Sequence, residues 1–206
     1  MIFIKLKPFE IALFIGLFAA VLIGGANAQS QKLADSIVRL HVVANSDTDE
    51  DQALKLEVRD RVIEITSSLN MGSDAQHAQI VLRENVDEIE TAVRQMVQEK
   101  GYDYPVTVTL GTENFDTRVY DTFSLPAGQY TSLRVTIGDG AGKNWWCVVF
   151  PPICMASCSE ELTSQAMAVG LDEGDVALIT GVNQIYVLKF KLLELVQSVK
   201  MMYNGK

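Results

Sequence analysis

The sequence predicts an α+β fold, and three patterns support this prediction. Residues 37–43 (IVRLHVV) form a β-branched apolar run, which is typical of a strand. Between residues 54 and 97, apolar side chains recur at helical steps of three and four. Between residues 106 and 150, apolar and polar residues alternate, as in half-buried strands. We therefore expect one domain, with a helical hairpin packed beside a mixed sheet of about four strands.

Two helices are expected after the first strand. The apolar positions of the first run from Leu54 to Leu69, and residues 70–73 (NMGS) end it. Those of the second run from Ala78 to Val97, and Gly101 stands where a glycine commonly closes a helix. The short break between the two runs predicts an antiparallel pair.

The expected strands that follow cover residues 106–110, 132–137 and 144–150. Between the last two lies "GDGAGK", residues 138–143, which lacks the spacing of a phosphate-binding loop and is interpreted as a hairpin turn. Apolar residues from Leu192 to Val199 follow helical steps and predict a C-terminal helix.

The N-terminal segment has the layout of a secretory signal peptide. Two lysines precede an apolar run over residues 11–26, and an A-x-A site ends at Ala28. We expect residues 1–28 to be a signal peptide, removed before Gln29, and residues 29–206 to be the exported domain; a retained membrane anchor is the alternative. The formal charge of −9 and the absence of a basic patch in the sequence argue against nucleic acid as a partner.

Three cysteines, Cys147, Cys154 and Cys158, lie within twelve residues. In an exported protein two of them can form a disulfide bond, and Cys147 with Cys154 is the favoured pair. Cys158 is the rival partner of Cys154. Inert thiols are the second interpretation, and a zinc site is the weakest because the spacing is wrong and no histidine lies nearby in the sequence.

The acidic run "NSDTDED", residues 45–51, resembles the start of a calcium-binding EF-hand loop. The sixth position, however, is Glu50 instead of glycine, and the twelfth is Leu56 instead of glutamate. We therefore expect a helix N-terminus capped by Ser46 or Asp47, and no specific metal site.

No catalytic motif is recognisable, and no cofactor is expected. A dyad of Cys147 and His41 on adjacent strands is geometrically possible, but no motif supplies a third group to orient the histidine. This dyad would make the protein a secreted Cys/His-type hydrolase acting on peptide or cell wall, which is the alternative function.

Three stretches of the chain are distinctive: "RLHVVANSDTDEDQALKLEVRD" (39–60), "LPAGQYTSLRVTIGDGAGKNWWCVVFPPIC" (125–154) and "YVLKFKLLELVQ" (186–197). They resemble stage II sporulation protein R of endospore-forming bacteria. The resemblance implies a signalling protein and not an enzyme. Members of this family are made in the forespore and exported into the space between the forespore and mother-cell membranes.

The resemblance also implies the partner and the pathway. The expected partner is a membrane-embedded aspartic protease of the mother cell, stage II sporulation protein GA, which then processes the sigma-E precursor. Contact with a membrane would come only through the signal segment or this partner. Trp145 and Trp146 are the candidate partner-binding residues, because tryptophan is enriched at interfaces and consecutive residues of a strand face opposite sides.

Overall fold

The computed structural model describes residues 30–120 and 123–153, together with isolated positions near both ends of the chain. The isolated positions are 7, 9, 13, 14, 16, 17, 166–168, 171, 175, 176 and 179. The signal cleavage site, Cys154, Cys158 and the expected C-terminal helix lie outside the described residues. Among the residues described, no helix is long and apolar enough to cross a membrane.

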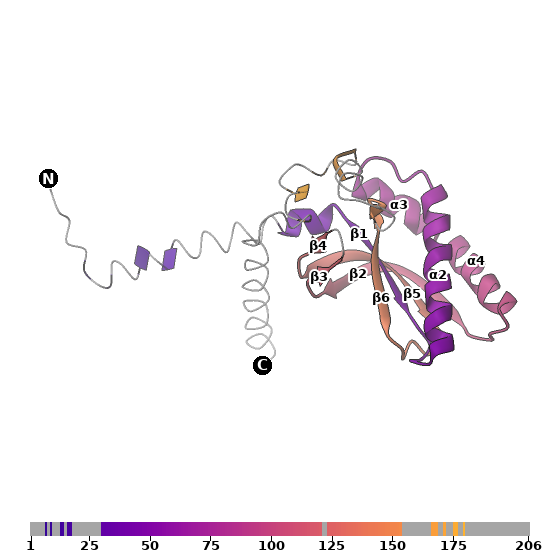
Figure 1. Cartoon of the computed structure of the whole chain (residues 1–206). Coiled ribbons are helices and arrows are strands. Elements are labelled where there is room, and N and C mark those ends of the chain that lie inside the picture. Colours follow the sequence, from indigo (N-terminus) through magenta and orange to yellow (C-terminus); the bar gives the residue numbers. More distant parts are fainter. Residues whose placement is uncertain are drawn as a thin grey trace.

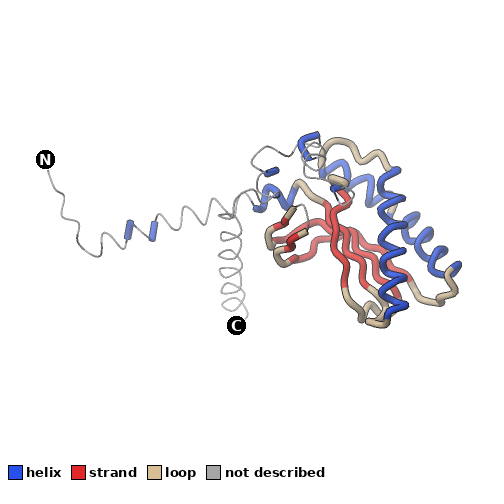
Figure 2. The backbone as a smooth tube through the Cα atoms, viewed as in Figure 1, coloured by secondary structure: helices blue, strands red, loops and turns tan. Residues whose placement is uncertain are grey.

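The described part has the predicted α+β architecture, with a mixed four-stranded sheet (Figures 1 and 2). Its strands are β1 (Val38–Val43), β2 (Val106–Phe115), β5 (Gly128–Ile137) and β6 (Asn144–Phe150), in the order β2-β5-β1-β6. β1 runs parallel to β5 and antiparallel to β6, and β2 runs antiparallel to β5. A second, two-stranded sheet, which the sequence did not predict, joins β3 (Arg118–Val119) and β4 (Ser124–Leu125).

Three helices cover one face of the four-stranded sheet: α2 (Asp49–Ser68), α3 (Ala75–Glu84) and α4 (Val86–Glu99) (Figure 1). The sequence predicted only two, because the apolar steps continue from α3 into α4. Asn85 divides them: its backbone leaves helical geometry, and its side chain donates to the carbonyl of Val81 at 2.7 Å. α2 and α4 pack against each other and are the two long helices of the expected hairpin.

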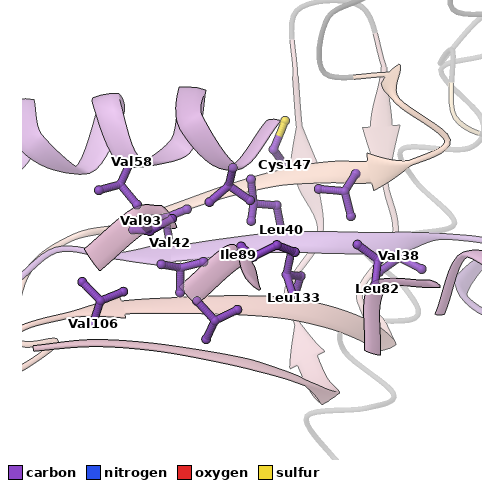
Figure 3. Close-up of a cluster of buried hydrophobic side chains, with 14 of the residues drawn as sticks. Val38, Leu40, Val42, Val58, Leu82, Ile89, Val93, Val106, Leu133 and Cys147 are labelled. Atoms are coloured by element: carbon purple, nitrogen blue, oxygen red, sulfur yellow. The ribbon is translucent and has the colours of Figure 1, made fainter. Parts of the chain in front are cut away.

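The main core lies between the helices and the sheet (Figure 3). Val38, Leu40 and Val42 of β1 point into it because alternate residues of a strand share one face. The helices contribute apolar residues such as Val58 and Ile89, which are completely buried. β1 is buried on both faces, since a second apolar cluster covers part of the opposite side of the sheet.

The segment 138–143 is a turn, as predicted, but it is not a hairpin turn. β5 and β6 are not neighbours, because β1 lies between them, so the segment crosses the carboxyl end of β1. Gly138 has a φ of +58°, which favours glycine, and a Cβ atom at Gly142 would lie 2.2 Å from the carbonyl oxygen of Ser46. Turn residues look alike in a hairpin and in a crossing of this kind, so the local sequence did not distinguish them.

Candidate functional site

The acidic run forms a junction between the end of β1, the start of α2 and the crossing segment. The N-cap of α2 is Thr48, whose hydroxyl accepts from the Asp51 backbone N–H. The prediction of a cap at Ser46 or Asp47 was therefore wrong by one or two positions, because the helix begins at Asp49. Asp47 instead accepts from the backbone N–H of Lys143 at 2.7 Å.

Asp51 is buried at the centre of this junction. Its carboxylate accepts from the Ser46 hydroxyl at 2.5 Å and from the Asn45 amide at 2.9 Å. Burial opposes its ionisation, but these hydrogen bonds outweigh burial and lower the pKa of Asp51. No group of three or more potential metal ligands occurs among the described residues. Asp47 and Asp51 thus use their carboxylates for structural hydrogen bonds.

The sheet face opposite the helices carries a polar cluster that the sequence analysis did not identify, apart from His41. The cluster consists of His41 on β1, Glu113 on β2, Arg134 on β5 and Asn144 on β6. Glu113 lies 3.1 Å from the Nδ1 atom of His41 and accepts from Arg134 at 2.9 Å. The Nε2 atom of His41 lies 2.8 Å from the Asn144 side-chain oxygen. Each strand of the sheet therefore contributes one polar side chain.

The electrostatics of the cluster favour a charged Glu113. Burial opposes its ionisation, but hydrogen bonds from neighbours that include Arg134 and His41 lower the pKa of Glu113. Both ring nitrogens of His41 are in contact with oxygen atoms, and the residue is only 9% exposed. In this arrangement the His41 side chain links β1 to β2 through Glu113 and to β6 through Asn144.

The proposed dyad of Cys147 and His41 is wrong. Cys147 pairs in register with Leu40 and belongs to the helix-side core, as Figure 3 shows. His41 lies on the opposite face of the sheet, where it stacks on Trp146 with ring centres 5.7 Å apart. The sheet therefore separates the Cys147 sulfur from the imidazole. The pairing of Cys147 with Cys154 stays a prediction, because Cys154 lies outside the described residues.

Arg39 is a completely buried cation beside the polar cluster. Its guanidinium lies 3.9 Å from the ring centre of Phe115 and 5.0 Å from that of Tyr130, and it donates to the Tyr120 hydroxyl at 2.9 Å. Its Nε and Nη1 atoms have no hydrogen-bond partner among the described residues. Burial lowers the pKa of Arg39. A residue that reads as a polar interruption in the sequence of β1 thus lies inside an aromatic cage.

We expect that replacing Arg39 with methionine will leave the free energy of unfolding unchanged or raise it. Burying an unpaired charge costs several kcal/mol, and each cation–π contact returns only about 1–2 kcal/mol. Methionine keeps the long stem without the charge. Urea titrations of Arg39→Met and Arg39→Ala test this, since alanine alone opens a cavity. If both variants lose stability equally, the guanidinium itself stabilises the fold.

Trp145 and Trp146 lie on opposite sides of β6, as predicted. Trp145 is 36% exposed on the helix side, where the guanidinium of Arg59 on α2 lies 4.6 Å from its ring centre. Trp146 is half-buried on the other side, where the guanidinium of Arg118 lies 3.7 Å from its ring. Neither tryptophan is a fully buried core residue, and each is paired with one arginine.

Comparison with known proteins identifies the family. The family model described as stage II sporulation protein R matches residues 34–160, which is more than half of the chain. The chain belongs to the stage II sporulation protein R family. The matched range includes the whole four-stranded sheet and the three helices. The resembling stretch 186–197 lies beyond it.

A curated relative supports the family assignment. Stage II sporulation protein R of Bacillus subtilis (strain 168) is 36% identical over 128 residues. The alignment covers 62% of this chain and 57% of the relative, so the chain spans little more than half of the relative's length. No solved structure matches this chain. The family description assigns a role in sporulation and does not name an enzyme.

Proposed function

We propose that this protein is an exported signal of sporulation that activates a membrane-embedded aspartic protease of the mother cell, stage II sporulation protein GA. The activated protease then processes the sigma-E precursor. The family match over residues 34–160 carries this proposal, since it places the chain among sporulation proteins. The finer role follows what the resemblance implies for the family.

The described residues favour a ligand over an enzyme. The one cysteine among them, Cys147, lies on the other face of the sheet from His41. His41 has both ring nitrogens engaged by Glu113 and Asn144. A ligand needs neither nucleophile nor base. It needs a surface that binds the active state of its receptor more tightly than the inactive state.

Such a surface must bind the active state of the receptor with a large free-energy preference. Moving a receptor from almost entirely inactive to almost entirely active takes roughly 5 kcal/mol of preference for the active state. Exposed tryptophan and arginine side chains commonly supply such energies at interfaces. Trp145 and Trp146, each paired with an arginine, are the residues we assign to this contact.

The proposal includes export of the protein and the oxidation of two of its cysteines to a disulfide. The signal segment 1–28 directs the chain into the space between the forespore and mother-cell membranes, with removal before Gln29. A disulfide between Cys147 and Cys154 then fixes the segment that follows Pro151 and Pro152 beside β6.

Reconstitution tests the proposed function. Membranes that carry the protease and the sigma-E precursor are mixed with the purified protein, and cleavage of the precursor is followed on gels. We expect cleavage to depend on the added protein and to disappear when the catalytic aspartates of the protease are replaced. The heat-unfolded protein is the control for non-specific effects. Cleavage at the same rate without the protein would contradict the proposal.

A further inference from the structure

The segment Asn144–Trp146 lies on β6, the last strand in the order of the described four-stranded sheet. Within the described part of the chain, Asn144–Trp146 of β6 pair with β1 on one side and with no strand on the other. Asn144 and Trp145 are exposed, and Trp146 is half-buried. Edge strands present unpaired backbone groups, and proteins usually protect them with lysine, proline or a covering element. Here two consecutive tryptophans occupy the edge, close to Lys143.

Three cations, Arg59, Arg118 and Lys143, lie around this edge, together with two acidic neighbours: Asp47 accepts from the backbone of Lys143, and Asp60 contacts Arg59. Arg59 lies over Trp145 on the helix side, and Arg118 lies over Trp146 on the other side. Lys143 directly precedes the strand and is exposed. Arg59 also contacts the exposed Asp60 at 2.7 Å, whereas Arg118 forms no ion pair within the described part of the chain. Both faces of one edge thus offer a cation on an aromatic ring.

A single added strand can contact both faces of the sheet, because its successive side chains point to opposite faces. A segment that adds to β6 as a further strand places successive side chains on opposite faces of the sheet. Its side chain beside Trp145 therefore lies near Arg59, and that beside Trp146 lies near Arg118. Directly opposed residues on neighbouring strands have Cβ atoms about 4.5–5.5 Å apart. A carboxylate opposite Trp145 or Trp146 therefore lies close to that ring and to the arginine over it.

We propose that the edge Asn144–Trp146 binds an extended segment of the partner protease by strand addition, and that this segment carries acidic side chains at consecutive positions. The inference rests on the proposed function for the identity of the partner. The backbone supplies the pairing, the tryptophans supply apolar area, and the two arginines select acidic residues on the two faces.

Binding to the protease in membrane discs tests the charge selection. Arg59→Glu and Arg118→Glu are expected to weaken binding about tenfold or more, and the loss is expected to shrink at high salt. Arg61→Glu on α2 and Arg83→Glu on α3 carry the same change of charge away from the edge and are expected to bind within about twofold of the parent. Equal losses of binding affinity for all four variants would show that Arg59 and Arg118 do not select acidic side chains.

Hydrogen exchange of the backbone tests strand addition itself. Within Asn144–Trp146, the N–H groups that do not bond to β1 are expected to exchange rapidly in the free protein and slowly in the complex. Weakened binding by the arginine variants without this protection would overturn strand addition. Protection in the absence of the protease, together with dimers in sedimentation, would assign the edge to a second copy of this chain and also overturn it.

These measurements separate the inference from the proposed function. If the parent protein neither binds the protease nor triggers cleavage, the proposed function fails. If it binds and triggers cleavage while the arginine variants match the parent, only the edge assignment fails. Melting temperatures of all variants establish that the fold is kept.

Discussion

Replacing Leu40 with alanine is expected to lower the free energy of unfolding by about 2–5 kcal/mol. Leu40 is completely buried on the central strand β1, between Leu133 of β5 and Cys147 of β6 (Figure 3). Helices close the space above it, so the surroundings relax only partly when the side chain is shortened. The lost transfer energy and the remaining cavity therefore both contribute.

Urea unfolding followed by circular dichroism measures this loss, with the cysteines kept in the same oxidation state in all samples. Leu56→Ala is the matched control, because it removes the same atoms from a side chain of α2 that is 36% exposed. We expect this control to change stability by less than about 0.5 kcal/mol. A loss below about 1 kcal/mol for Leu40→Ala would show that this position is not tightly packed.

Replacing Asp51 with asparagine is expected to destabilise the protein by about 1.5–3 kcal/mol at neutral pH, the range for hydrogen bonds to a charged group. The carboxylate accepts from Asn45 and Ser46 at the junction of β1 and α2. Its pKa is lowered in the folded protein, so its contribution is present above the unfolded pKa of about 4. The contribution is lost as the pH falls through the folded pKa.

The difference in unfolding free energy between the parent and Asp51→Asn is therefore expected to shrink as the pH falls below about 4. Urea titrations across this range measure it. Asp49→Asn makes the same chemical change two positions earlier, at an exposed residue in the first turn of α2, and serves as the control. A difference for Asp51→Asn that is constant with pH would show that Asp51 contributes no pH-dependent stability.

Periodicity predicted the elements well where one face of an element is buried. The strand at residues 144–150 and the helix beginning near Leu54 both appear in the structure because their apolar residues face one core. Periodicity could not detect the division at Asn85, since α3 and α4 contribute to the same core. Nor could it reveal that β1 lies between β5 and β6, because pairing order depends on contacts far apart in the sequence.

The polar cluster was not predicted, for a related reason, and His41 was considered only as a partner of Cys147. His41 is one polar residue within the apolar run of β1, and Glu113 lies beyond the expected end of the strand at residue 110. Their meeting depends on the pairing order, in which β5 lies between β1 and β2 and carries Arg134, which donates to Glu113. The two tryptophans were easier, since consecutive residues of any strand face opposite sides.

The position of β1 in the sheet has a consequence for the order in which the chain can fold. β1 is the first strand, yet both of its neighbours come more than eighty residues later, with Val38 opposite Thr131 and Phe150. Closing such long loops costs entropy before the contacts form, so the sheet is expected to assemble slowly compared with the helices. A nascent chain that ends before β6 leaves one long side of β1 unpaired. The four-stranded sheet therefore cannot be completed until the chain has been made at least to Phe150.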